Sequence, residues 1–353
     1  MNIGIIGLPQ TGKKTLFRLL TGRTDHDHAD LHVGTADIID PRFDALVEAY
    51  RPRKQVRAKI DFFLFPKLEK ESIAKGDIFK DIVTTDAICH VVRAFHDPSV
   101  YHAYSSVDPE RDITTINSEL LFHDLLFVEK RLERIAAQLK KAKDERQQKE
   151  QELLLKMKSH LEAERPLRLL PLSAEEAALV RSYPFITLKQ MIIIINTDDT
   201  SLRNDALIKQ LAPLCASEKM EMMQVSAKVE AEIAALESPE ERKEFLQEIG
   251  IAEPALGQLT RLCLKALGLI SFFTVGDDEV RQWLLRQGSH APDAAGVIHS
   301  DLQRGFIRAE VMKYEELRTY KSEAALKAAG KVYLKGKDYI VEDGDILNIR
   351  FKV

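Results

Sequence analysis

Three near-continuous apolar runs stand out along the chain: "MNIGII" at 1–6, "DAICHVVRAF" at 86–95 and "QMIIIINTDD" at 190–199. Such runs are typical of central strands in a parallel sheet, which are buried on both faces. After the first run, Leu16, Leu19 and Leu20 follow helical spacing in "KKTLFRLLTG", and the pattern stops at Gly22. The pattern of this segment therefore predicts a strand, a loop and a helix. Together, the three apolar runs predict an α/β fold for the chain.

Between the second and third runs, the apolar spacing changes to alternating steps of four and three. The residues in this pattern are Leu121, Leu125, Val128, Leu132, Ile135, Leu139 and Ala142, followed by Leu154, Met157 and Leu161 on a returning arm. Heptad spacing predicts a coiled coil, so we expect residues 119–166 to form an inserted α-helical hairpin. Its charged tip holds Lys140, Lys141, Lys143 and Arg146, which indicates either RNA contact or simply a solvated helix surface.

The last part of the chain changes character again. "VYLKGKDYIVEDGDILNIRF" alternates apolar and polar residues around turns at Lys335-Gly336 and Asp343-Gly344, which predicts short hairpin strands of a small mixed sheet. His290, His299 and Asp301 lie near one another in the preceding stretch. Because no second cluster completes a coordination shell, we interpret them as turn and loop residues rather than a metal site.

Length and composition limit the number of domains and the class of protein. The 353 residues are 45% hydrophobic, enough for a sizeable core divided over two or three domains. A net charge of -4 gives no global nucleic-acid signature, and no run approaches the roughly 20 apolar residues of a membrane span. The first apolar run is too short for a signal peptide. Three widely separated cysteines indicate neither a metal site nor a disulfide framework, so we expect a reduced, cytoplasmic protein.

The loop after the first strand carries the strongest chemical signal. "GLPQTGKKT" at 7–15 resembles the phosphate-binding pattern G-x-x-x-x-G-K-[ST], in which backbone N–H groups and a helix N-terminus bind phosphate. The alternative is an ordinary glycine-containing turn, which the flanking strand, the helix and Lys13 disfavour. The predicted phosphate-binding residues are Gln10, Thr11, Gly12, Lys13, Lys14 and Thr15.

Two later motifs concern the nucleobase. Asn196 and Asp199 keep the spacing of N-K-x-D, whose carboxylate accepts hydrogen bonds from guanine, although Thr197 replaces the stacking lysine. Downstream, Ser226, Ala227 and Lys228 match the S-A-K loop that backs the base. Each motif is weak alone, but in this order behind a phosphate loop they predict a GTPase-type G domain.

The stretch from "LGLISFFTVGDDEVRQW" to the end closely resembles the C-terminal TGS domain of the YchF (Obg-like) ATPase family. "DPRFDAL", "DITTINSELLFHDL" and "QVSAKVEAEIAALE" follow the family's order, so the resemblance spans the chain. It implies a P-loop NTPase G domain at 1–118 and 167–268, a coiled-coil insertion at 119–166 and a β-grasp TGS domain at 269–353. It also implies ATP hydrolysis in preference to GTP, and association with ribosomes.

The chain departs from the family on the metal side of the site. Lys14 stands where a Ser or Thr ligates Mg²⁺. The stretch matching D-x-x-G, "KIDFFLFPKLEKES", keeps Asp61 but has Leu64 in place of the glycine, and the first switch is shortened. Mg²⁺ binding is therefore doubtful, and no catalytic or metal-ligating residue is assigned.

Two hypotheses follow from this pattern of losses. Either the protein is a working YchF-type ATPase or GTPase on the ribosome, or it is a ribosome- or RNA-associated scaffold with a degenerate G domain. We predict retained ATP or GTP binding with weak or lost hydrolysis. The family has Glu where Asp199 stands, a departure associated with its ATP preference, so we expect only modest discrimination between the two nucleotides. We expect a monomer with a ribosomal or RNA partner and no membrane.

Overall fold

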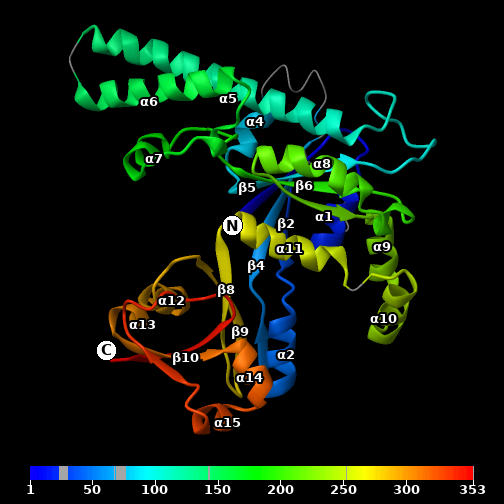
Figure 1. The fold of residues 1–353 in the computed structure, drawn as a ribbon, viewed down its shortest axis with the longest axis vertical. Coiled ribbons are helices and arrows are strands. Elements are labelled where there is room, and N and C mark those ends of the chain that lie inside the picture. Colours follow the sequence, from blue (N-terminus) through cyan, green and yellow to red (C-terminus); the bar gives the residue numbers. More distant parts are fainter. Residues whose placement is uncertain (24–30, 67, 69–76, 142–143, 252, 353) are drawn as a thin grey trace. The chain divides into compact units, whose positions relative to one another are not determined.

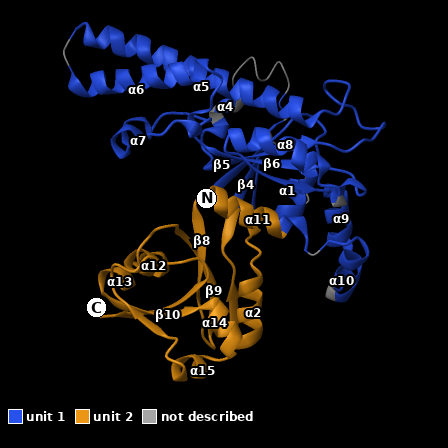
Figure 2. Ribbon diagram, in the orientation of Figure 1, with its two compact units in different colours: residues 1–35, 61–256 blue, residues 36–60, 257–353 orange. Residues whose placement is uncertain are grey.

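The computed structural model describes all residues except 24–30, 67, 69–76, 142–143, 252 and 353 (Figure 1). The chain forms two compact units (Figure 2). The first unit comprises residues 1–35 and 61–256, and the second comprises residues 36–60 and 257–353. No helix in the described part of the chain is long and apolar enough to cross a membrane.

The first sheet has the strand order β2-β4-β1-β5-β6-β7. Its strands are β1 (Asn2–Ile6), β2 (His32–Asp37), β4 (Lys59–Leu64), β5 (Ala87–Arg93), β6 (Gln190–Asn196) and β7 (Glu221–Val225). Neighbours from β4 to β7 pair in parallel, and every residue of β5 is buried. The three apolar runs therefore form adjacent central strands, as their composition predicts.

The helices of the first unit surround this sheet and extend from it. They are α1 (Lys13–Thr21), α4 (Asp77–Ile82), α5 (Pro109–Leu139), α6 (Glu145–Glu162), α7 (Ala174–Val180), α8 (Ala206–Ser217), α9 (Ala227–Ala235) and α10 (Pro239–Glu248), with short 3-10 turns η1 (Leu167–Leu169) and η2 (Ser201–Arg203). Helix α11 (Ala255–Ala266) crosses from the first unit into the second.

Helices α5 and α6 run side by side as the predicted hairpin (Figure 1). Val128 and Ile135 of α5 pack with Leu154, Met157 and Leu161 of α6 in one apolar cluster. The first turns of α5 instead pack on the central sheet through Ile113, Ile116 and Leu120. One continuous helix thus serves both the α/β core and the hairpin, and it starts ten residues before the predicted insertion boundary at 119.

The second sheet has the order β11-β10-β12-β8-β9-β3. Its strands are β3 (Lys54–Val56), β8 (Leu269–Thr274), β9 (Glu279–Arg286), β10 (Phe306–Lys313), β11 (Tyr333–Lys335) and β12 (Asp345–Phe351), accompanied by α2 (Pro41–Tyr50), α12 (Ala291–Ile298), α13 (Ser300–Arg304), α14 (Tyr314–Tyr320) and α15 (Glu323–Ala328). The sheet is mixed, as predicted. However, β11 and β12 both pair with β10 and not with each other, so the predicted hairpin between them was wrong.

The unit boundaries differ from the predicted domain boundaries because residues 36–60 and 257–268 group with the second unit. Strand β3 adds to the second sheet through β9, and Phe43 and Leu46 of α2 join an apolar cluster with Phe273. The sequence interpretation missed this, because pairing between segments over 200 residues apart leaves no local pattern.

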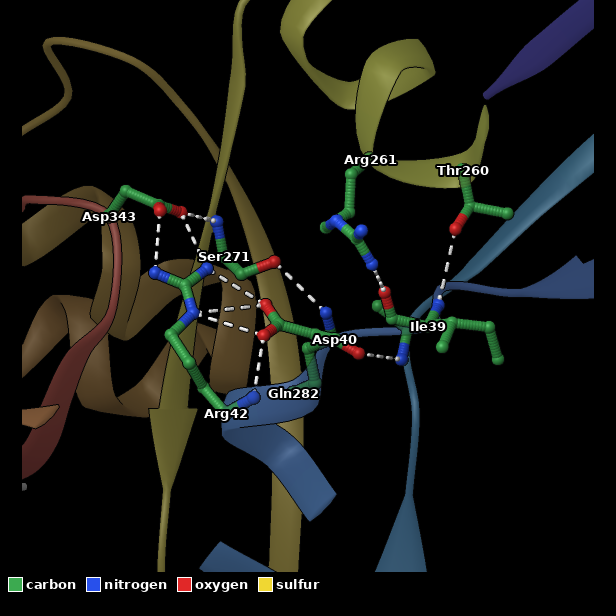
Figure 3. A network of polar contacts seen from close by, with 9 residues as sticks. Ile39, Asp40, Arg42, Thr260, Arg261, Ser271, Gln282 and Asp343 are labelled. Atoms are coloured by element: carbon green, nitrogen blue, oxygen red, sulfur yellow. Dashed lines mark hydrogen bonds and ion pairs between the residues drawn. The ribbon is translucent and has the colours of Figure 1, made fainter. Parts of the chain in front are cut away.

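A polar network reinforces the same grouping (Figure 3). The guanidinium of Arg42 donates to both carboxylate oxygens of Asp40 and to Asp343, and Asp343 accepts from the backbone N–H of Ser271. Asp40 is buried and also caps the N-terminus of α2. Thr260 accepts from the N–H of Ile39, which ties α11 to the same segment.

The histidines and the aspartate near 290–301 act locally. His290 is the N-cap residue of α12, and Nδ1 of His299 accepts from the backbone N–H of Asp301 at 3.1 Å at the start of α13. Both belong to helix starts, in line with their interpretation as turn and loop residues.

Candidate nucleotide-binding site

The loop at 7–12 follows the carboxyl end of β1 and leads into α1. Gly12 has a φ of 93°, and a Cβ there would lie 2.2 Å from Nδ2 of Asn196. A Cβ on Gly7 would lie 2.5 Å from the carbonyl oxygen of Val91 on β5. The loop therefore needs glycine at both ends because it lies directly against neighbouring chain.

Lys13 is the first residue of α1 and only 5% exposed. Its Nζ donates to the carbonyl oxygens of Gly7 and Leu8, at 3.1 Å each, so the side chain folds back over the loop. Thr11 is buried, and its hydroxyl donates to the same carbonyl of Leu8 at 3.2 Å. A helix N-terminus, a close-packed loop and an ammonium at one edge of the sheet suit an anionic phosphate chain.

Lys14 and Thr15 are exposed in the first turn of α1. Gln10 is exposed as well and has a positive φ of 58°. These residues belong to the loop and first helical turn as predicted, but Lys14 offers an ammonium where a metal ion requires an oxygen ligand.

The register of β4 corrects the assignment of Asp61 and Leu64. Asp61 is inside β4 and pairs with Asn2 at the start of β1, whereas Leu64 pairs with Ile5. Because the two strands are parallel, Asp61 lies toward the amino edge of the sheet and Leu64 toward the carboxyl edge, where the phosphate loop begins. The aspartate of a D-x-x-G element belongs at the carboxyl end of this strand, a place that Leu64, the last residue of β4, fits better than Asp61 does. The glycine position of the motif would then be Lys67, which lies outside the described residues.

Asp61 has a structural role instead. Its carboxylate accepts from the hydroxyl of Thr35 at 2.7 Å, and its backbone N–H donates to the carbonyl of Met1. The side chain of Leu64 is buried, at 3% exposure, and carries no ligand atom. The protein groups at Lys14 and Leu64 therefore do not fit Mg²⁺, which takes oxygen ligands.

The predicted base-binding residues come together at the ends of β6 and β7. Asn196 Nδ2 donates to the carbonyl of Thr11 at 2.9 Å, and Asn196 Oδ1 accepts from the N–H of Ala227 at 3.0 Å. One buried amide thus joins the phosphate loop to the S-A-K loop. Asp199 accepts from Lys228 at 2.7 Å and from the hydroxyl of Ser226 at 3.3 Å.

The two carboxylates of "NTDD" have different surroundings. Hydrogen bonds from Ser201 and, to a smaller extent, from the hydroxyl of Thr200 lower the pKa of Asp198. It is therefore engaged in a turn. Among the described residues, Asp199 accepts hydrogen bonds from the side chains of Lys228 and Ser226, and its own side chain is 41% exposed. Asp199 is the carboxylate that is accessible to a ligand.

Sequence interpretation missed His90, which lies in β5 in register with Ile6, the last residue before the phosphate loop. It is 1% exposed, and neither ring nitrogen has a hydrogen-bond partner among the described residues. Burial, with a smaller contribution from the charge of Lys13, lowers its pKa to about 3. The only signal was a histidine inside an apolar run.

At the hairpin tip, Lys140, Lys141 and Arg146 are exposed. Within the described part of the chain, none of the three forms a salt bridge. Lys143, the fourth predicted contact residue, lies outside the described residues. Exposed cations at the tip fit both of the alternatives raised by the sequence.

Comparison with known proteins covers the whole chain. Residues 269–352 match the family YchF-GTPase_C, described as "Protein of unknown function (DUF933)". The chain is 40% identical over 370 aligned residues to "Ribosome-binding ATPase YchF" of Bacillus subtilis (strain 168), with 100% of each chain covered. The protein of the same name from Escherichia coli O157:H7 is 39% identical, with 99% of each chain covered.

A solved structure agrees in fold. The "Structure of the Schizosaccharomyces pombe YchF GTPase" matches with a TM-score of 0.83 and 32% identity, over 99% of this chain and 97% of that chain. The predicted fold class is confirmed: an α/β G domain with a helical insertion, followed by a C-terminal β domain.

Proposed function

Because this chain belongs to the YchF (Obg-like) ATPase family, we propose that it binds a purine nucleotide, ATP or GTP, and hydrolyses it weakly or not at all. The observation that supports the proposal is that Lys14 follows the P-loop lysine and that Leu64 ends β4, the two places that we match to the metal contacts of a G domain. The residues of the phosphate loop and of the base side are kept in this chain. We therefore expect nucleotide binding to be retained even though hydrolysis is weak or lost.

The physical reason lies in the charge of the transferred phosphoryl group. In phosphoryl transfer, a bound Mg²⁺ neutralises charge on the β- and γ-oxygens. An ammonium at Lys14 supplies positive charge for binding but cannot impose the octahedral arrangement that positions water and substrate. The buried Leu64 side chain supplies no oxygen for an outer ligand. Nucleotide affinity is thus retained without the groups that favour the transition state.

On the base side, Asn196 joins the phosphate loop to the S-A-K loop, and Asp199 is the exposed carboxylate beside them. With Thr197 buried at 3% exposure, no lysine stem covers the base. The loss of this stacking contact weakens both purines alike, whereas a carboxylate favours guanine. We therefore propose binding of both GTP and ATP with modest discrimination.

Hydrolysis is tested by steady-state phosphate release from ATP and GTP with and without Mg²⁺, alone and with ribosomes. We expect rates close to background, and we expect Lys14→Ser with Leu64→Asp to gain part of the Mg²⁺-dependent rate. Lys13→Ala serves as the binding-deficient control. A robust Mg²⁺-dependent turnover by the native chain would establish the alternative, a working ATPase.

The relatives from Bacillus subtilis and Escherichia coli are named as ribosome-binding. We propose that this chain likewise associates with the ribosome or another RNA, as a cytoplasmic monomer, using the hairpin tip and the C-terminal domain. Cation contacts to phosphate weaken steeply with salt. Sedimentation with ribosomes should therefore fall when Lys140, Lys141 and Arg146 become alanine, and should persist in Lys13→Ala. Association that requires nucleotide and vanishes in Lys13→Ala would instead indicate a nucleotide-switched factor.

A further inference from the structure

The hairpin carries a second candidate site that shares no residue with the nucleotide site. A cleft of about 390 Å³ opens between the middle of α5 and the segment that follows α7. Phe127, Lys130, Arg131 and Arg134 line it from α5, and Tyr183 and Pro184 line it from the other side. Its size falls within the range of ligand-binding clefts in proteins.

The aromatic side chains of the cleft form a fixed platform. Phe127 and Tyr183 are partly exposed, with ring centroids 5.3 Å apart. Behind them, the buried ring of Phe185 packs edge-on against both, at 5.3 and 5.9 Å. The Tyr183 hydroxyl donates to Glu150 and accepts from Nε of Arg131. Ring contacts and a polar anchor therefore set the orientation of Tyr183 before any ligand binds.

The cations around the platform are unequal. Arg131 is paired with Glu150, at 2.7 Å, and its charge is compensated. Lys130 and Arg134 are exposed, and neither forms a salt bridge within the described residues. They are spaced i and i+4, so they lie on one face of α5, where like charges repel. Glu133 lies between them in sequence but does not line the cleft. An anionic ligand at this face would relieve the repulsion.

We propose that this cleft binds single-stranded RNA. An unpaired base would stack on the ring of Tyr183, with its edge against the ring of Phe127, which is tilted 60° from that of Tyr183, and the neighbouring phosphates would contact Lys130 and Arg134. Stacking on aromatic side chains beside basic residues is how proteins hold unpaired nucleotides. An acidic peptide would use the two cations but not the ring faces, and a duplex hides its bases. The inference deepens the RNA association proposed above and rests on it.

The test is fluorescence anisotropy of a labelled short oligouridylate titrated with the full chain between about 50 and 200 mM KCl. Lys130→Ala with Arg134→Ala should weaken binding and reduce the slope of log affinity against log salt by about 1.4, since each phosphate contact on a single strand contributes about 0.7. Arg165→Ala with Lys209→Ala is the matched control, because it removes the same charges from exposed positions elsewhere in the same unit.

The ring is tested separately from the charge. Tyr183→Leu should weaken binding at least about fivefold with an unchanged salt slope, whereas Tyr183→Phe keeps the stacking surface and should bind nearly as the native chain does. Circular dichroism of each variant confirms that the hairpin is folded. A polyglutamate competitor should displace the oligonucleotide poorly; equal displacement would indicate a general anion surface and overturn the inference.

Other outcomes separate this inference from the proposed function. If the cleft variants bind the oligonucleotide like the control while the hairpin-tip variants lose it, the cleft inference is wrong and the RNA association stands. If the native chain binds neither the oligonucleotide nor ribosomes, both are wrong. The affinity of the cleft variants for ATP and GTP should be the same as that of the native chain.

Discussion

Replacement of His90 by leucine should remove part of the acid sensitivity of the fold. The pKa of His90 is lowered from 6.5 to about 3, chiefly by burial. Between these values the unfolded chain binds a proton that the folded chain does not. Stability therefore falls as pH falls through this window. The pH falls by about 1.5 units below the unfolded pKa of 6.5 when it reaches about 5, and each unit corresponds to about 1.36 kcal/mol. The free energy of unfolding should therefore fall by roughly 2 kcal/mol between neutral pH and about pH 5.

Leucine has similar bulk and no ionisable group. Because both ring nitrogens of His90 lack hydrogen-bond partners among the described residues, His90→Leu should be neutral or slightly stabilising at neutral pH. The assay is urea unfolding of the native and variant proteins near pH 7.5 and pH 5, followed by circular dichroism. Other titrating groups are common to both proteins and cancel in the comparison. An equal loss of stability on acidification in both proteins would refute the reasoning.

Five further substitutions, one of them a control, test particular contacts. Asn196→Ala leaves two buried backbone groups unpaired and should cost roughly 2–4 kcal/mol in urea unfolding, with a loss of nucleotide affinity in calorimetry. Gly12→Ala should abolish nucleotide binding because its Cβ has no space, whereas Gly22→Ala, which meets nothing within 4 Å, should cost only roughly 1 kcal/mol of stability and retain binding. Asp124→Asn replaces a fully buried carboxylate that accepts hydrogen bonds from two backbone N–H groups and a hydroxyl. Thermal unfolding should show that the protein loses roughly 2–4 kcal/mol of stability. Arg42→Met leaves the buried carboxylate of Asp40 without its counter-ion, so urea unfolding of the second unit should show a loss of roughly 3 kcal/mol.

Structural features that depend on a local sequence pattern were predictable. The three apolar runs form β1, β5 and β6, and the heptad positions of α5 and α6 pack together. Asn196 and the S-A-K loop meet because the carboxyl ends of adjacent parallel strands share one edge of a sheet. Motif order along the chain carries that information.

Features set by pairing over long distances were not predictable. The sequence shows an aspartate near a strand end, but only the pairing of β4 with β1 shows that Asp61 lies at the wrong edge of the sheet. The assignment of 36–60 to the second unit rests on β3 pairing with β9, more than 200 residues away. His90 and the Tyr183 cleft depend on burial and on contacts between segments, which no single window contains.

We propose that the nucleotide site of this chain operates without a bound metal ion. Isothermal titration of ATP and GTP into the native protein, in excess Mg²⁺ and again in excess chelator, tests it most directly. With Lys14 and Leu64 at the metal-facing positions, we expect dissociation constants that differ by less than about threefold between the two conditions, since Mg²⁺ gains no ligand from the protein. An affinity that rises tenfold or more with Mg²⁺ would show that the chain provides metal contacts after all, and would contradict the account.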